Sequence, residues 1–101
     1  MNTLNSLILE GKTSKEKGYH FIDNEEQTMA QFDIECQRVC YDKGEEVQEV
    51  YNFPCRAYGN IAKLLDSKLK QEIGIRVVGF LKEIEGAIWV YVEHVEFKKI
   101  K

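Results

Sequence analysis

The stretch that decides the fold runs from Asn52 to Leu81 and reads N-F-P-C-R-A-Y-G-N-I-A-K-L-L-D-S-K-L-K-Q-E-I-G-I-R-V-V-G-F-L. Its first part alternates up to Tyr58, which is typical of a half-buried strand because successive side chains point to opposite faces of a sheet. Gly59 then provides a turn, and residues 75–81 return to a strand pattern that contains a second glycine. Between them, apolar residues at helical spacing predict a short amphipathic helix: Ile61, Leu64, Leu65 and Leu69.

Alternating segments on either side of this stretch predict the remaining strands. Pro54 removes a ladder donor, so its strand should pair at an edge, at a bulge or through a strong bend. Asn60 is the expected N-cap of the helix. Residues 1–101 are all taken up by one set of elements, which predicts a single domain. The expected strands are Ser6–Lys12, Tyr19–Ile22, Thr28–Val39, Val47–Tyr58, Ile75–Leu81 and Ala87–Phe97.

Four segments, in this order and at this spacing, resemble the bacterial single-stranded DNA-binding protein family. Asn5–Gly11 resembles the opening strand of that family, and Phe32–Cys36 resembles the core of its second strand. Tyr58–Ala62 is similar to its aromatic-Gly-x-apolar-Ala turn, and Glu93–Phe97 to the end of its fifth strand. The resemblance implies an all-β fold, a five-stranded OB barrel with one short α-helix between the third and fourth strands.

The amino-acid composition and net charge exclude several classes of protein. With 44% hydrophobic and 31% charged residues, the chain is an ordinary globular protein and not a disordered one. Its apolar runs are too short for a membrane span, and its first residues lack a signal sequence, so we expect a cytoplasmic protein with no membrane partner. The net charge of −3 argues against a tight clamp on duplex DNA but is compatible with single-strand binding.

The sequence offers no set of residues for catalysis or for a cofactor. Cys36, Cys40 and Cys55 lack the paired Cys-x2-Cys spacing of zinc sites, so we expect reduced thiols and no metal, with Cys36 and Cys55 acting as small apolar strand residues. His20 and His94 are isolated from any Ser-His-Asp arrangement. We therefore expect a non-enzymatic protein without cofactors.

Aromatic residues provide a more credible binding site, because bases stack on aromatic rings with about 1–3 kcal/mol each. Tyr58 and Arg56 have the same strand parity, so a ring and a guanidinium should project from one face. The resemblance implies base stacking by Tyr58 and by Tyr41. Tyr51 adjoins Asn52, where a tryptophan of the family would be expected. The candidate nucleic-acid-binding residues are Tyr58, Arg56, Tyr41, Arg38, Tyr51 and Lys63.

Two other aromatic residues, Trp89 and Tyr91, are expected on the barrel exterior or in a subunit contact. Open strand edges and the resemblance together predict a homo-oligomer, a tetramer rather than a dimer. The sequence ends in the basic segment 98–101, whereas many members of the resembled family carry an acidic tail. This ending is compatible with a core domain, with a tailless paralogue, or with the primosomal restart protein that shares the fold.

Two functions follow from these expectations. The first is sequence-tolerant binding of single-stranded DNA in replication, recombination and repair, with replication or repair proteins as further partners. The alternative is an OB-fold protein-interaction or primosome-assembly module with weak or no single-strand binding. Salt-dependent binding to an oligonucleotide distinguishes the two.

Overall fold

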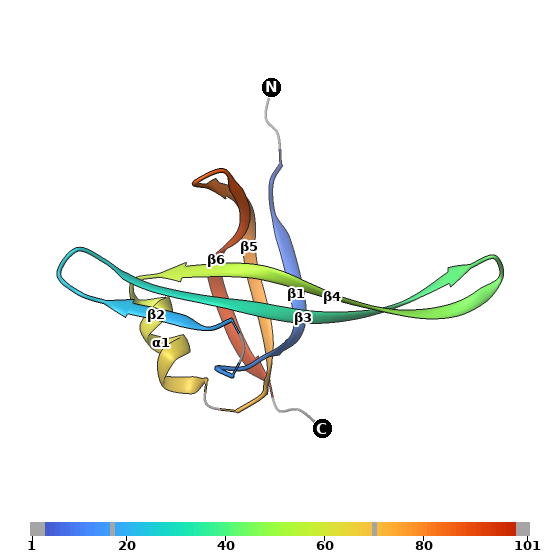
Figure 1. Cartoon of the computed structure of the whole chain (residues 1–101), viewed down its shortest axis with the longest axis horizontal. Coiled ribbons are helices and arrows are strands. Elements are labelled where there is room, and N and C mark those ends of the chain that lie inside the picture. The colour runs from blue at the N-terminus through green and yellow to red at the C-terminus, as the bar shows by residue number, and fades with distance from the viewer. Residues whose placement is uncertain (1–3, 17, 70, 99–101) are drawn as a thin grey trace.

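The computed structural model describes residues 4–16, 18–69 and 71–98 (Figure 1). In chain order its elements are β1 (Leu7–Thr13), β2 (His20–Asp23), β3 (Thr28–Asp42), β4 (Glu45–Tyr58), α1 (Asn60–Lys68), β5 (Ile73–Ile84) and β6 (Ala87–Lys98). In these ranges no helix is long and apolar enough to cross a membrane.

Five of the strands close into a barrel. The sheet order is β1-β5-β6-β4-β3-β2, and an additional pairing of β1 with β3 at Lys12 and Glu35 joins the two ends of the curled sheet. Among the described strands, β4 and β6 alone pair in parallel, at Cys55 with Val90 and at Arg56 with Tyr91. The short strand β2 is an addition on the outer edge of β3. Helix α1 therefore lies between the third and fourth barrel strands, which confirms the predicted OB fold.

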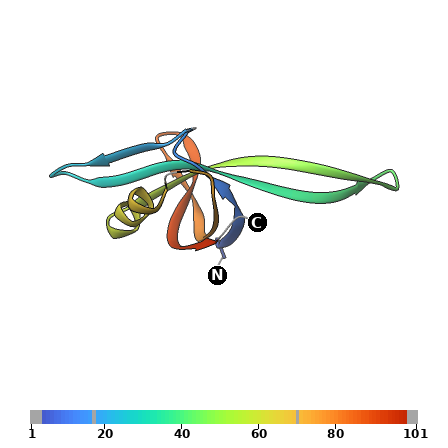
Figure 2. The same cartoon turned by 90° about the horizontal axis from the view of Figure 1, so that it is seen from below.

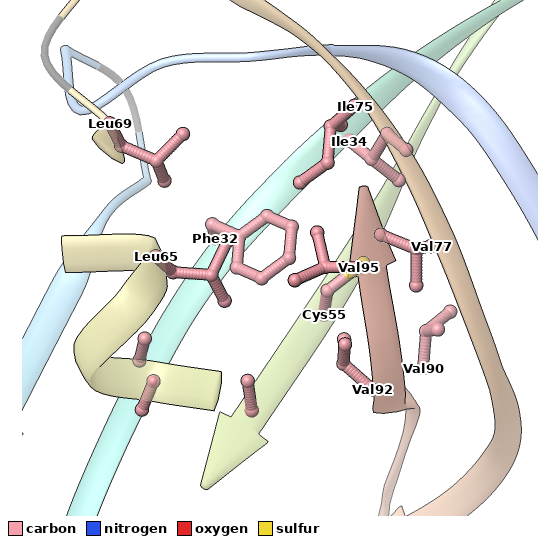
Figure 3. Close-up of a cluster of buried hydrophobic side chains, with 13 residues drawn as sticks. Phe32, Ile34, Cys55, Leu65, Leu69, Ile75, Val77, Val90, Val92 and Val95 are labelled. Carbon is pink, nitrogen blue, oxygen red and sulfur yellow. The ribbon is translucent and has the colours of Figure 1, made fainter. Parts of the chain in front are cut away.

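The core lies between the barrel strands and the helix (Figure 3). Phe32 and Ile34 of β3 are fully buried, as their shared parity predicts. Leu65 of α1 reaches the same cluster and covers one end of the barrel. Burial of such a side chain contributes about 1.5–3 kcal/mol, so the cluster is the main source of stability. Its labelled members are Phe32, Ile34, Cys55, Leu65, Leu69, Ile75, Val77, Val90, Val92 and Val95. Core packing by Cys55 is confirmed.

The start of the helix differs from the prediction. Gly59 is the N-cap, with a positive φ of 67° that favours glycine, and no side-chain capping bond is present. Its N–H donates to the carbonyl oxygen of Thr28 at 3.0 Å, which ties the turn to β3. Asn60 is already helical, so its predicted N-cap role is wrong. The buried face is also rotated, because Ala62 is buried while Leu64 is 42% exposed.

Beyond the barrel, β3 and β4 continue as a two-stranded ribbon on the side away from α1 (Figures 1 and 2). We call residues 37–50 the arm. Its register runs without a shift from Cys36–Tyr51 to the last pair, Asp42–Glu45. The strands are thus longer than the alternation predicted. Along residues 45–54, β4 pairs with β3 alone among the described strands, which places Pro54 at an edge, as expected.

The connection between β1 and β2 is anchored to the helix. Tyr19 donates its hydroxyl hydrogen to Asp66 Oδ1 at 2.5 Å. Lys15 Nζ lies 3.0 Å from the same oxygen and also donates to the Asp66 carbonyl oxygen. The bond from Tyr19 holds the pKa of Asp66 below its ordinary value, with a further contribution from Lys15. Burial, together with the bond to Asp66, raises the pKa of Tyr19.

Candidate nucleic-acid interface

The outer face of the barrel is built by simple alternation. In β4, Arg56 and Tyr58 alternate with the fully buried Cys55 and Ala57, so they point outward. In β6, Trp89 and Tyr91 alternate in the same way with core valines. The parallel register sets Arg56 directly beside Tyr91. Outward side chains of two strands that are distant in sequence therefore form one surface.

Three rings stack across this surface. The ring centroids of Tyr58 and Tyr91 are 5.5 Å apart with an interplanar angle of 22°. Those of Phe80 and Tyr91 are 4.9 Å apart at 25°. We call Tyr58, Tyr91 and Phe80 the aromatic row. Because β6 lies between β4 and β5, Tyr91 is the middle ring, and the end rings Tyr58 and Phe80 are the ones that can take a further stacking partner.

Two cations lie against the rings of this face. The guanidinium carbon of Arg56 is 4.3 Å from the centroid of the Trp89 ring. Lys82 Nζ is 5.0 Å from the centroid of Tyr91, and Lys82 is the cross-strand partner of Trp89. Such cation–π contacts fix the positions of the charged groups.

These two cations are not neutralised by carboxylates within the described ranges. Arg56 and Lys82 make no ion pair there, and Arg56 Nε is buried without a hydrogen-bond partner. By contrast, Lys98 lies 3.0 Å and Arg76 lies 3.6 Å from Glu10 on the β1–β5–β6 side of the barrel. Both cations beside the aromatic row therefore keep donors that an anionic ligand can use.

The six residues predicted from sequence do not form one cluster. Tyr58 and Arg56 lie together on the barrel face, as expected. Tyr41, at 76% exposure, lies on the arm on the same face of the β3–β4 ribbon as those two, because the register has no shift. Arg38 and Tyr51 share the opposite face of that ribbon. Lys63 is exposed on the first turn of α1, and a nucleic-acid contact by these last four residues stays a prediction.

Sequence reasoning placed Trp89 and Tyr91 on the exterior, and that position is confirmed. It missed their association with Arg56 and Tyr58, and it missed Phe80 and Lys82 altogether. The signal that points to them is the alternation of outward aromatic and cationic residues in the last two strands. Alternation becomes informative only when the pairing of β4 with β6 is also known, because those strands are distant in sequence.

A separate hollow of about 310 Å³ lies where β1 meets β3. Its lining includes the carboxylates Asp33, Glu35 and Glu72, and Lys12 lies 3.7 Å from each of the last two. This acidic lining disfavours phosphate. In the described part of the chain, no group of three or more His, Cys, Asp or Glu residues is arranged to hold a metal ion.

The sequence matches no protein-family model and no curated protein. A deletion mutant of the single-stranded DNA-binding protein from Thermus aquaticus is similar in structure, with a TM-score of 0.80 at 19% identity over 95% of this chain. The Plasmodium falciparum single-stranded DNA-binding protein, solved in complex with single-stranded DNA, gives 0.78 at 15% identity and covers 100% of this chain and 98% of that one. PriB from Ralstonia solanacearum gives 0.72 at 14% identity, covering 94% and 98%.

The chain has the fold of single-stranded DNA-binding proteins. It spans 51% of the length of the Thermus protein. At identities of 14–19% this likeness shows the fold alone.

Proposed function

We propose that this protein is a cytoplasmic, non-catalytic member of the single-stranded DNA-binding protein family that binds single-stranded DNA with little sequence preference. The observation that carries the proposal is the aromatic row flanked by Arg56 and Lys82, two cations without carboxylate partners among the described residues. Rings and free cations on one barrel face match the two parts of a DNA strand, its bases and its phosphates.

The chemistry divides between the end rings and the cations. Bases stack on Tyr58 and Phe80, while Arg56 and Lys82 bind phosphates, with Lys63 beyond the Gly59 turn as a further contact. Stacking tolerates any sequence because every base has a π-face. The middle ring, Tyr91, holds the end rings in place before the strand arrives, which lowers the entropic cost of binding.

The biological setting of such a site is exposed single strands during replication, recombination and repair. We propose that the protein protects these strands as a homo-oligomer and that replication or repair proteins are its partners. The Plasmodium falciparum protein of the same fold was solved with single-stranded DNA, which supports the choice of ligand.

The test is a titration of an oligothymidylate with the protein at several salt concentrations. Trp89 is the single tryptophan of the chain and lies against Arg56, so its fluorescence reports binding at this face. We expect saturable binding whose log K falls with log salt by about 0.7 for each phosphate neutralised. Arg56→Gln and Lys82→Gln should each lower that slope by about 0.7.

Arg76→Gln is the matched control, because Arg76 lies 3.6 Å from Glu10 near the opposite end of β5 from Lys82. It should leave the slope unchanged. Absence of saturable binding at low salt would overturn the proposal and would favour the second candidate, a protein-interaction module. That candidate is motivated by the arm, whose exposed apolar residues and carboxylates are unsuited to phosphate.

A further inference from the structure

The outer face of the arm carries a strip of exposed apolar side chains. Val39, Tyr41 and Val50 are 53%, 76% and 49% exposed. The register pairs Gln37 with Val50 and Val39 with Gln48, so Val39 and Val50 are diagonal neighbours and Tyr41 continues the line. We call Val39, Tyr41 and Val50 the arm strip. A two-stranded ribbon is marginally stable alone, and exposed apolar surface on it marks a contact with another molecule.

Charge selects the kind of partner that fits the arm strip. Glu46 is the cross-strand partner of Tyr41 on this face. Asp42, Glu45 and Glu49 lie on the opposite face, and with Glu46 they give the arm four carboxylates against two cations. This end of the ribbon repels a phosphate backbone, whereas it attracts a surface that combines apolar rings with unpaired cations.

The chain itself carries such a surface, namely the aromatic row with Arg56 and Lys82. Val50, Arg56 and Tyr58 have the same parity along β4, so the arm strip and the row lie on the same face of one ribbon. A two-fold dimer requires that the patch contacted on one copy be matched by the reciprocal contact on the other. A second copy turned end for end meets this requirement, because each arm strip then covers the row of the other copy.

We propose that, in the absence of DNA, the arm strip of one copy docks on the aromatic row of a second copy, with Glu46 facing Arg56 and Lys82. Self-association through this contact and strand binding are then mutually exclusive. The inference rests on the proposed function only in naming single-stranded DNA as the competitor. Its consequence is a protein whose binding face is covered until a strand displaces the partner's arm.

The contact is tested by photo-crosslinking of the full chain. We would introduce Val39→p-benzoylphenylalanine, mix it with isotopically labelled wild-type chains, and identify the crosslinked peptides by mass spectrometry. The expected crosslinks join the arm to residues 80–91 or 56–58 of the labelled copy, and added oligothymidylate suppresses them. Val47→p-benzoylphenylalanine is the control, because Val47 is 39% exposed on the opposite face of the arm.

The outcomes separate this inference from the proposed function. If the oligonucleotide does not bind and the crosslinks to the row persist, the contact is supported and the proposed function is wrong. Crosslinks to another surface, crosslinks only within one chain, or crosslinks that bound oligonucleotide leaves unchanged overturn the inference. Crosslinks that Arg56→Gln with Lys82→Gln leaves unchanged overturn it as well.

A binding measurement provides a second test, because the inference predicts that loss of the arm contact raises the affinity for oligothymidylate. If roughly nine-tenths of the chains are self-associated, the apparent affinity for oligothymidylate is about tenfold below the intrinsic one. The double variant Val39→Ser, Val50→Ser should therefore bind up to about tenfold more tightly at high protein concentration. Both positions are exposed and outside the core, so the fold is retained. Unchanged or weaker binding by this variant would contradict the inference.

Discussion

Tyr58 is the last residue of β4, and its position is determined on three sides. Tyr91 stacks against its ring, Met29 pairs with it across the sheet, and Gly59 follows it at a positive φ. A ring held in this way keeps its orientation before any ligand arrives. At a stacking site such preorganisation reduces the entropy lost on binding.

The first prediction concerns this ring. Tyr58→Ala should weaken oligothymidylate binding by about 1–3 kcal/mol, because one end of the aromatic row is lost. Tyr58→Phe keeps the ring and should bind close to wild type. Fluorescence titration at constant salt measures both. Equal affinities of the Ala and Phe variants would show that the Tyr58 ring does not stack on a base.

The second prediction concerns Gly79, which lies at the register shift between β5 and β6. A Cβ atom at this position would lie 2.0 Å from the carbonyl oxygen of Tyr91. Gly79→Ala should therefore force β5 and β6 apart and cost about 3 kcal/mol of unfolding free energy or more. Urea denaturation measures the loss.

Gly44→Ala is the control for that substitution. Its Cβ would meet nothing within 4 Å, so the cost is limited to the left-handed φ of 81°, about 1 kcal/mol. A loss for Gly79→Ala no larger than for Gly44→Ala would show that the close approach is easily relieved.

At the scale of elements, helix α1 is fixed from outside as well as by its buried face. Asp66 accepts bonds from Tyr19 and Lys15, which lie between β1 and β2. The helix has only nine residues and lacks a side-chain cap, so such a tertiary anchor contributes much of its stability.

This anchor predicts a pH dependence. The folded-state pKa of Asp66 is lowered, so its contribution is fully present above the ordinary value of 3.8 and is lost as the pH falls through the folded-state pKa. Asp66→Asn should lower the unfolding free energy by about 1 kcal/mol at neutral pH, a modest value because the carboxylate is partly exposed. In urea denaturation the difference from wild type should shrink as the pH falls through the folded-state pKa of Asp66.

Asp23→Asn is the matched control, because Asp23 is an exposed carboxylate outside this network. A difference between Asp66→Asn and wild type that stays constant down to the acid range would contradict a role for the charged carboxylate.

Local patterns in the sequence predict the strands and the helix well, and they fail for elements that depend on distant partners. Phe32 and Ile34 are recognisable as core from parity alone. The stacking of Tyr58 on Tyr91 is not, because it arises from a parallel pairing of only two residue pairs. The length of the arm escapes prediction for a related reason. Its polar residues continue the strands through mutual pairing rather than through burial.

For the molecule as a whole, charge is unevenly distributed. The three hairpin turns carry acids, with Asp23, Glu25 and Glu26 at the first and Glu83 and Glu85 at the third. The cations beside the aromatic row lie on the barrel body. A net charge of −3 is therefore compatible with a locally positive binding face, and the acidic turns disfavour phosphates elsewhere.

The assembly provides the last prediction. The outer edge of β1 pairs with β3 at one residue pair, and Ile8 is exposed beside it, so this strand can join a further copy. The edge of β1 and the proposed arm contact together give each chain two surfaces for association. We expect sedimentation at micromolar concentration to give the mass of four chains rather than two. A monomer under those conditions would contradict the prediction.

The pairing that closes the barrel also bears on where the molecule opens. β1 pairs with β5 through seven residue pairs but with β3 through Lys12 and Glu35 alone. Among the described residues, one ladder pair closes the curled sheet, and a hydrogen bond of 2.7 Å from Thr13 Oγ1 to the carbonyl oxygen of Asp33 lies beside it. Amide hydrogens beside this pair should exchange with solvent sooner than those of the β5–β6 hairpin, since local opening begins where few bonds must break.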